Sequence, residues 1–281
     1  MSAWLTFGIG HDPGQLGNTF PLDIAVWGDV RHTLSALNAS WKDTHTRQPH
    51  LERRSAALRA RGEQRVRQLH DEATGHAAER PIHPNYLAHV AGTVLPEGTV
   101  VASESFRNAD HLMPFGFDKG QWCLVRTFGA SLGYGIGAAV GAQLGAPDRP
   151  VVCSLGDGAV MYSASGFWTM ARYGLPILTI VWNNLNYQTV RTNFHTFGGE
   201  MAKQKKYPEV YLGDPEIDFV MLAKAQGIEG TEVREPQALE AALRRGVDAI
   251  TAGEPYLLDV RVAPVGKGAE STWHQRFKLW K

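Results

Sequence analysis

The sequence has few cysteines and no cluster of potential zinc ligands. Of its 281 residues, two are cysteines, Cys123 and Cys153. They are too few for a disulfide framework and too far apart for a closely spaced ligand pair, and the eleven histidines show no ligand spacing either. We therefore expect a reducing compartment and a cytoplasmic protein. The start at Met1 fits this view, because no basic segment and apolar run of a signal peptide follow it.

Charge of one sign is not in excess. Lys and Arg together number 28, as do Asp and Glu, so the formal net charge is zero. A broad nucleic-acid-binding surface needs a basic excess to displace counterions, so we predict no nucleic-acid partner. A chain without net charge tends to self-associate, which favours an oligomer.

A long run of large apolar residues is also missing. Residues 127–147 carry no charge and have about the length of a membrane-spanning helix, but the stretch is rich in glycine and contains Gln143. Its glycines recur at every fourth position from Gly133 to Gly145, which makes a smooth ridge for close packing. We expect a buried helix here and no membrane partner.

Composition divides the chain into three parts. Residues 1–40 contain short apolar runs broken by Gly and Pro and then a helical pattern, which is typical of the end of a larger α/β domain. Residues 41–80 are polar and rich in arginine and helix formers. Their arginines allow phosphate binding, but a solvated linker helix is the simpler interpretation. Residues 81–281 are long enough for the main domain.

Apolar runs alternate with helical patterns throughout residues 81–281. The runs typical of buried strands are 100–103, 151–155, 177–182 and 256–262. The helical patterns lie near 85–94, 131–145, 163–173, 216–226 and 236–250. This alternation predicts an α/β fold, a doubly wound parallel sheet with helices on both faces.

Polar residues follow two consecutive strand runs. Gly156-Asp157-Gly158 follows the run 151–155, and Asn183-Asn184 follows the run 177–182. A right-handed crossover would make these strands parallel neighbours, so both tips should lie at one edge of the sheet. A carboxylate and amide oxygens are suitable ligands for Mg²⁺, and glycines beside Asp157 would let phosphate oxygens approach the backbone.

Two other interpretations of these residues remain open. Gly156-Asp157-Gly158 alone is also compatible with a simple turn. Gly133, Gly135 and Ala138 fit a loose dinucleotide-binding fingerprint, with Asp157 near the position of a ribose-binding acid. The second interpretation gives the asparagine pair no role.

The motif and its spacing resemble a known family. Gly156-Asp157-Gly158, followed after twenty-four residues by Asn183-Asn184, is similar to the thiamine diphosphate motif of 2-oxo acid decarboxylases, acetolactate synthase and their relatives. Residues 11–37 resemble the end of that family's central domain. The segments that resemble benzoylformate decarboxylase more than other members are 132–146, Tyr162-Ser163, Trp168-Thr169, Tyr173 and Pro176.

The resemblance implies a thiamine diphosphate-binding domain of the pyrophosphate type, preceded by a partial central-domain segment. It implies Mg²⁺ binding by Asp157, Asn184 and the Asn186 carbonyl. Leu132 matches the apolar residue that holds the cofactor bent, and the Ala130 carbonyl matches the acceptor for its aminopyrimidine. The diphosphate would be lined by Gly156, Gly158, Ala159, Tyr187 and Gln188.

This chain departs from the pattern at two positions. Ala159 replaces a hydroxyl residue of many relatives, and Phe106 with Arg107 stands where benzoylformate decarboxylase has small hydroxyl residues. Phe106 is therefore a candidate substrate contact. The other candidate contacts follow the metal loop: Thr189, Val190, Asn193 and Phe194.

In this family a second domain binds the aminopyrimidine and supplies a glutamate that activates the cofactor. That domain normally precedes the central domain, and no segment ahead of residue 81 is long enough for it. We therefore expect half an enzyme, whose partner polypeptide carries the pyrimidine-binding domain in a heterotetramer or larger assembly. A fragment is the competing explanation, and the start at Met1 favours a genuine subunit.

The resemblance implies a lyase or carboligase acting on a small-molecule 2-oxo acid or 2-hydroxy ketone, with no certain catalytic residue in this chain. One alternative is a non-catalytic subunit that binds the cofactor or regulates the enzyme. Another is a nicotinamide-dependent oxidoreductase, which would need no Mg²⁺.

Overall fold

We describe a computed structural model of the chain, covering residues 5–44, 49–105, 112, 115–116, 123–125 and 131–274. Two compact units are present, Met1–Gln64 and Arg65–Lys281. Helix α2 (Pro49–Gly75) continues across residue 64, so the division between the two units falls inside this helix. The domain limits expected at residues 40 and 80 stay a prediction.

The first unit contains a two-stranded parallel sheet and a helix. Strand β1 (Phe7–Gly10) pairs with β2 (Ile24–Trp27), with Ile9 opposite Val26. Helix α1 (Val30–Thr44) follows directly. Both strands consist of apolar residues and glycine, but large side chains such as Phe7 and Trp27 are exposed in them.

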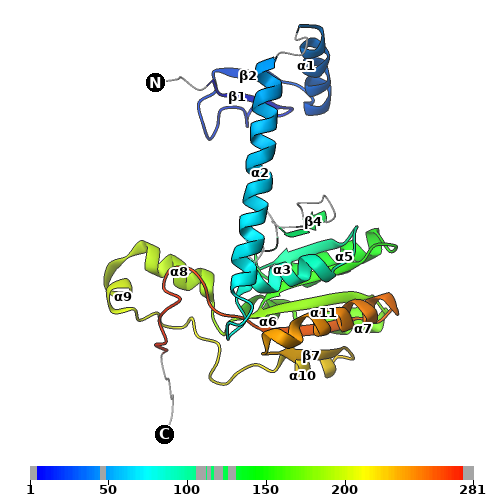
Figure 1. The fold of residues 1–281 in the computed structure, drawn as a ribbon, viewed down its shortest axis with the longest axis vertical. Coiled ribbons are helices and arrows are strands. Elements are labelled where there is room, and N and C mark those ends of the chain that lie inside the picture. Colours follow the sequence, from blue (N-terminus) through cyan, green and yellow to red (C-terminus); the bar gives the residue numbers. More distant parts are fainter. Residues whose placement is uncertain are drawn as a thin grey trace. The chain divides into compact units, whose positions relative to one another are not determined.

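The second unit is built on a six-stranded sheet in which all pairings are parallel (Figure 1). Its strands, in spatial order, are β4 (Cys123–Val125), β3 (Val100–Glu104), β5 (Val151–Gly156), β6 (Ile177–Asn183), β8 (Tyr256–Arg261) and β7 (Glu229–Val233). The four central strands are the four apolar runs of the sequence. This sheet, flanked by helices, confirms the predicted α/β fold class.

Helices cover both faces of the sheet and enclose two apolar cores. On one face, α3 (Pro84–Val94) and α11 (Pro236–Thr251) contribute Leu87 and Leu243 to the first core. On the other, α5 (Tyr134–Gly145), α7 (Gly166–Arg172) and α10 (Phe219–Lys224) contribute residues such as Ile136 and Phe219. Burial on both faces explains why the central strands are continuously apolar.

The structure differs from the expected elements in three places. The helix expected near 163–173 is divided into α6 (Asp157–Ser163) and α7, so helical backbone begins at the end of β5. Two edge strands, β4 and β7, were not predicted, because β4 has three residues and β7 is polar and partly exposed. The helices α8 (Gln188–Phe197) and α9 (Gly199–Gln204) were not predicted either.

The uncharged stretch around α5 forms a helix that contributes to a core. Gly135, Ile136, Ala139 and Gln143 are buried there. The close packing expected of the repeated glycines is not found at Gly137, Gly141 and Gly145, which are exposed with no described atom beyond the local helix backbone within 4 Å of an added Cβ. Within the residues described above, no helix combines the length and the apolarity needed to cross a bilayer.

Candidate functional site

The tips of two neighbouring strands form the floor of the site. β5 and β6 are paired in parallel, with Ser154 opposite Ile180 and Gly156 opposite Trp182. Both strands therefore end at the same edge of the sheet. Asp157 directly follows β5 and Asn184 directly follows β6, as the strand–helix–strand order predicts.

Asp157 is buried at this edge and connects the two tips. Its side chain accepts hydrogen bonds from the backbone N–H of Gly158, at 2.8 Å, and of Asn186, at 3.3 Å. With 3% of its surface exposed, the carboxylate is largely removed from water. Burial raises the pKa of Asp157 to about 7, against the opposing effect of the surrounding backbone N–H groups.

The loop after β6 is held by its own asparagines. Asn184 Oδ1 accepts the backbone N–H of Asn186 at 2.9 Å, and the Asn186 side-chain amide donates to the Asn184 carbonyl at 2.7 Å. Leu185, between them, has a left-handed φ of 57°. The side-chain hydrogen bonds offset the strain of that turn, and they hold the Asn186 N–H beside Asp157.

A buried arginine, Arg191, binds this loop through hydrogen bonds. The Arg191 guanidinium donates to Asn186 Oδ1 and, at 3.0 Å, to the Ser271 carbonyl. Arg191 itself is buried. It was not among the predicted site residues, and a single arginine inside an unpredicted helix gave no signal for it.

Gly158 and Tyr187 are in close contact in the site. A Cβ added to Gly158 would lie 2.3 Å from Tyr187 Cε1. The backbone N–H of Tyr187 donates to the Val210 carbonyl at 2.8 Å, which holds the residue in place. A side chain at position 158 would therefore collide with the tyrosine ring.

These residues line a cleft of about 280 Å³. Most of the predicted site residues lie on its walls: Leu132, Gly156, Asp157, Gly158, Ala159, Asn184, Asn186, Tyr187, Gln188, Thr189 and Val190. Sequence positions from three segments are thus gathered in one place. Their roles toward cofactor, metal and substrate stay predictions.

Four predicted residues are not among the described residues of the cleft. Asn193 and Phe194 are on α8, one turn beyond Val190, and the described lining of the cleft does not include them. Their absence from the lining weakens the case for direct substrate contact by either residue. Ala130 and Phe106 lie outside the described residues.

Glu104 is part of the cleft, although it was not among the predicted site residues. It ends β3, is buried, and its two carboxylate oxygens accept the backbone N–H groups of Gly133 and Gly135, the latter at 2.5 Å. Burial raises the pKa of Glu104, and these two hydrogen bonds oppose that shift. The missed signal was a carboxylate at the carboxyl end of a buried strand.

Glu104 fixes the turn that carries Leu132 into the cleft. Gly133 has a φ of 93°, and a Cβ added to Gly135 would lie 2.8 Å from Glu104 Cβ. A dinucleotide phosphate at the start of α5 would need the backbone N–H groups of Gly133 and Gly135. Both groups already donate to the Glu104 carboxylate.

The family described as "Thiamine pyrophosphate enzyme, C-terminal TPP binding domain" matches residues 108–260. The acetolactate synthase large subunit of Parasynechococcus marenigrum is 28% identical over 89% of this chain and 38% of its own length. Benzoylformate decarboxylase of Pseudomonas aeruginosa is 26% identical over 89% of this chain and 42% of its own length.

Among solved structures, the thiamine diphosphate-dependent 4-hydroxybenzoylformate decarboxylase of Rhodococcus jostii RHA1 is similar, with a TM-score of 0.56 and 28% identity. That match covers 66% of this chain and 33% of the neighbour. The chain thus spans well under half the length of these relatives. With the family match over more than half of its residues, the chain belongs to the thiamine pyrophosphate-dependent enzymes and contains their C-terminal cofactor-binding domain.

Proposed function

We propose that this chain is the diphosphate- and Mg²⁺-binding subunit of a heteromeric thiamine diphosphate-dependent C–C lyase or carboligase. Its substrate would be a 2-oxo acid or a 2-hydroxy ketone. The observation that carries the proposal is the buried Asp157 carboxylate, bonded to the backbone of Asn186 across two neighbouring strand tips. A buried carboxylate with a raised pKa is costly to maintain, and a bound cation offsets that cost.

The oxygen atoms beside Asp157 suit Mg²⁺. Asn184 Oδ1 accepts one N–H, and the Asn186 carbonyl accepts the Gln188 N–H at 2.8 Å, so each keeps a second lone pair. A carboxylate and two neutral oxygens are a set of hard ligands to which substrate phosphates are commonly added. We propose these three residues as the metal ligands.

The backbone next to Asp157 suits a diphosphate. Gly158 presents backbone where no Cβ fits, and Gln188 follows Tyr187 in the lining of the cleft. We propose that Gly156, Gly158, Ala159, Tyr187 and Gln188 line the diphosphate and that Leu132 and Ala130 support the rest of the cofactor. Phe106, Thr189 and Val190 remain the proposed substrate contacts.

When bound, thiamine diphosphate supplies the nucleophilic carbon that adds to a carbonyl and accommodates the electron pair released when a C–C bond breaks. The residues of this chain hold and orient the cofactor and exclude water from its diphosphate end. The glutamate that activates the cofactor is expected in the pyrimidine-binding domain of the partner chain.

An exposed apolar surface supports the proposed partner. Tyr162, Trp168 and Tyr173 are 58%, 57% and 70% exposed, and Tyr162 Cβ lies 3.1 Å from where a Cβ on Gly133 would be, next to Leu132. Several exposed aromatic side chains, of which Tyr162 lies near Leu132 of the cleft, are typical of a protein interface. We propose that the pyrimidine-binding domain of the partner covers this surface.

The experiment that tests this proposal is native mass spectrometry of the protein purified from its source. We expect a second polypeptide and a bound thiamine diphosphate with Mg²⁺ in the same particle. A particle that contains this chain alone, with the cofactor and full turnover, would contradict the heteromer. Turnover of a 2-oxo acid by the assembled particle separates a catalytic subunit from the non-catalytic alternative.

The nicotinamide-dependent alternative is disfavoured by Glu104. Its carboxylate takes the N–H groups of Gly133 and Gly135 and would repel a pyrophosphate there. Calorimetry with NAD⁺ and with thiamine diphosphate plus Mg²⁺ distinguishes the two, and we expect heat of binding only with the second ligand.

A further inference from the structure

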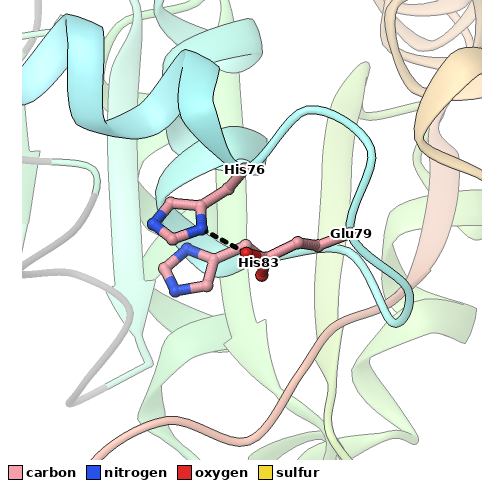
Figure 2. Close-up of side chains that lie close together, drawn as sticks. All are labelled: His76, Glu79 and His83. Carbon is pink, nitrogen blue, oxygen red and sulfur yellow. Dashed lines mark hydrogen bonds and ion pairs between the residues drawn. The ribbon is translucent and has the colours of Figure 1, made fainter.

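Three potential metal ligands meet in the turn between α2 and α3. Figure 2 shows His76, Glu79 and His83 with their side chains converging on one side of this turn. One ligand atom from each residue lies within 4.8 Å of the others. Among the described residues this is the one group of its kind, and none of its members lines the cofactor cleft.

The three side chains are already in contact. His76 Nδ1 lies 2.7 Å from Glu79 Oε1, and the rings of His76 and His83 are stacked, with centroids 3.7 Å apart and an interplanar angle of 10°. In the first of these contacts, His76 Nδ1 donates its proton to the Glu79 carboxylate in a hydrogen bond. A divalent cation can replace that proton, because imidazole nitrogen and carboxylate oxygen are both ligands once deprotonated.

The backbone that carries these ligands is well anchored. Ile82, next to His83, is fully buried and forms a parallel bridge with Val262, while Ala73, shortly before His76, is fully buried in the same core. Within the turn, the Glu79 N–H donates to the His76 carbonyl at 3.1 Å. The ligands therefore come from positions that folding has already brought together, which lowers the entropic cost of binding an ion.

We propose that His76, Glu79 and His83 form a binding site for a divalent transition-metal ion, with Zn²⁺ as the best match. Two imidazoles and one carboxylate are a known three-ligand set for Zn²⁺, which leaves a coordination position for water. Mg²⁺ prefers oxygen ligands alone, so the site selects against the metal proposed for the cofactor cleft.

Binding requires a small rearrangement. A nitrogen lone pair lies in the plane of its ring, so two stacked rings direct theirs in parallel, and one ring must turn to share an ion. The His76 side chain is 27% exposed and has room to rotate. His83 Nδ1 now accepts the Asn85 N–H at 3.1 Å, which caps α3, and the metal bond competes with this cap.

The bound ion would join the end of α2 to the beginning of α3. His76 follows the last turn of α2 and His83 is the N-cap of α3, so one ion would cross-link two helices across a short turn. We therefore expect the ion to stabilise this part of the second unit without entering the reaction.

The test uses the full chain, freed of metal with a chelator and then loaded with Co²⁺ or Zn²⁺ in the presence of excess Mg²⁺. After gel filtration, we expect a single equivalent of retained metal, visible absorption bands of nitrogen-coordinated Co²⁺, and a higher melting temperature. In H76A and E79Q we expect the retained equivalent and the temperature shift to disappear.

Two controls separate this site from others. His32 contacts Asp29 at 3.2 Å as an exposed pair that has no third potential ligand among the described residues, so H32A should retain the metal as the wild type does. D157N removes the proposed Mg²⁺ ligand of the cleft and should also retain it, whether or not the proposed function holds. Wild-type protein that keeps no Co²⁺ or Zn²⁺, or H76A and E79Q proteins that keep it fully, would overturn the proposal.

Discussion

The carboxylate of Asp157 accepts a hydrogen bond from the backbone N–H of Asn186 at 3.3 Å, across 29 positions of sequence. This bond joins the end of β5 to the loop after β6. It brings the carboxylate beside the loop that carries Asn184 and Asn186, whose oxygens we propose as further ligands of a divalent cation. Asp157 and Asn186 are close in space only because β5 and β6 pair with each other.

Replacing Asp157 with Ala should abolish Mg²⁺-dependent retention of thiamine diphosphate. Substitutions near a metal ligand already weaken affinity by about 10- to 100-fold, so loss of the ligand itself should exceed about 100-fold. Calorimetry of cofactor binding with Mg²⁺ and with a chelator measures this. Equal binding by wild type and D157A would show that the metal assignment is wrong.

Cofactor binding should weaken as the pH falls through about 7. Burial raises the pKa of Asp157 from 3.8 to about 7, so its proton competes with Mg²⁺ below that value. We expect the apparent affinity for Mg²⁺ to fall by about tenfold per pH unit below that pKa. Binding that is constant between pH 5 and pH 8 would contradict this account.

The same pKa shift predicts the pH dependence of stability without metal. Between the unfolded pKa of 3.8 and the folded pKa of about 7, the folded state holds more protons at Asp157 than the unfolded state does. The free energy of unfolding should therefore decrease as the pH rises through this window. Denaturant titrations of wild type and D157N at several pH values measure it, and the wild type should show the larger decrease.

Gly158→Ala should destabilise the protein by about 1–3 kcal/mol, because the new Cβ would lie 2.3 Å from Tyr187 Cε1. The matched control is Gly137→Ala in α5, where no described heavy atom outside the local helix backbone lies within 4 Å of an added Cβ. A helical glycine replaced by alanine gains up to about 1 kcal/mol. Urea denaturation compares the two, and equal effects would contradict the proposed Tyr187 contact.

Glu104→Ala should lower the free energy of unfolding by about 1–3 kcal/mol, because it leaves the buried N–H groups of Gly133 and Gly135 without their acceptor. It should also loosen the turn that carries Leu132. The control is Glu240→Ala, which removes an exposed pair with Arg244 and should cost less than about 1 kcal/mol. Similar losses in both variants would show that Glu104 has no special role.

Trp168→Ser should weaken association with the partner chain by on the order of tenfold or more, since aromatic side chains dominate interfaces. The residue is 57% exposed, so the isolated chain should keep its fold and melting temperature. Leu58, an exposed apolar residue of α2, provides the control variant L58S. Analytical ultracentrifugation of mixed chains measures the effect. Unchanged assembly by W168S would show that Trp168 is not part of the interface.

The central sheet and most of the cleft residues were predictable from the sequence. Apolar runs such as 177–182 are long enough to identify buried strands, and helical patterns between them require parallel pairing. Edge strand β7 was not predictable, because its alternating polar residues lack that signal. The helices after Asn186 were missed for a similar reason, since α8 and α9 have few apolar residues to bury.

The sequence by itself determined which strand tips carry the proposed oxygen ligands, because Asp157 and Asn184 each follow an apolar run that must be buried in neighbouring strands. Only the tertiary structure decided the contacts of Glu104 with Gly133 and Gly135, and the meeting of His76, Glu79 and His83. The physical reason is that periodicity encodes burial and direction along one element. Contacts across turns and between segments depend on the packing of the whole unit.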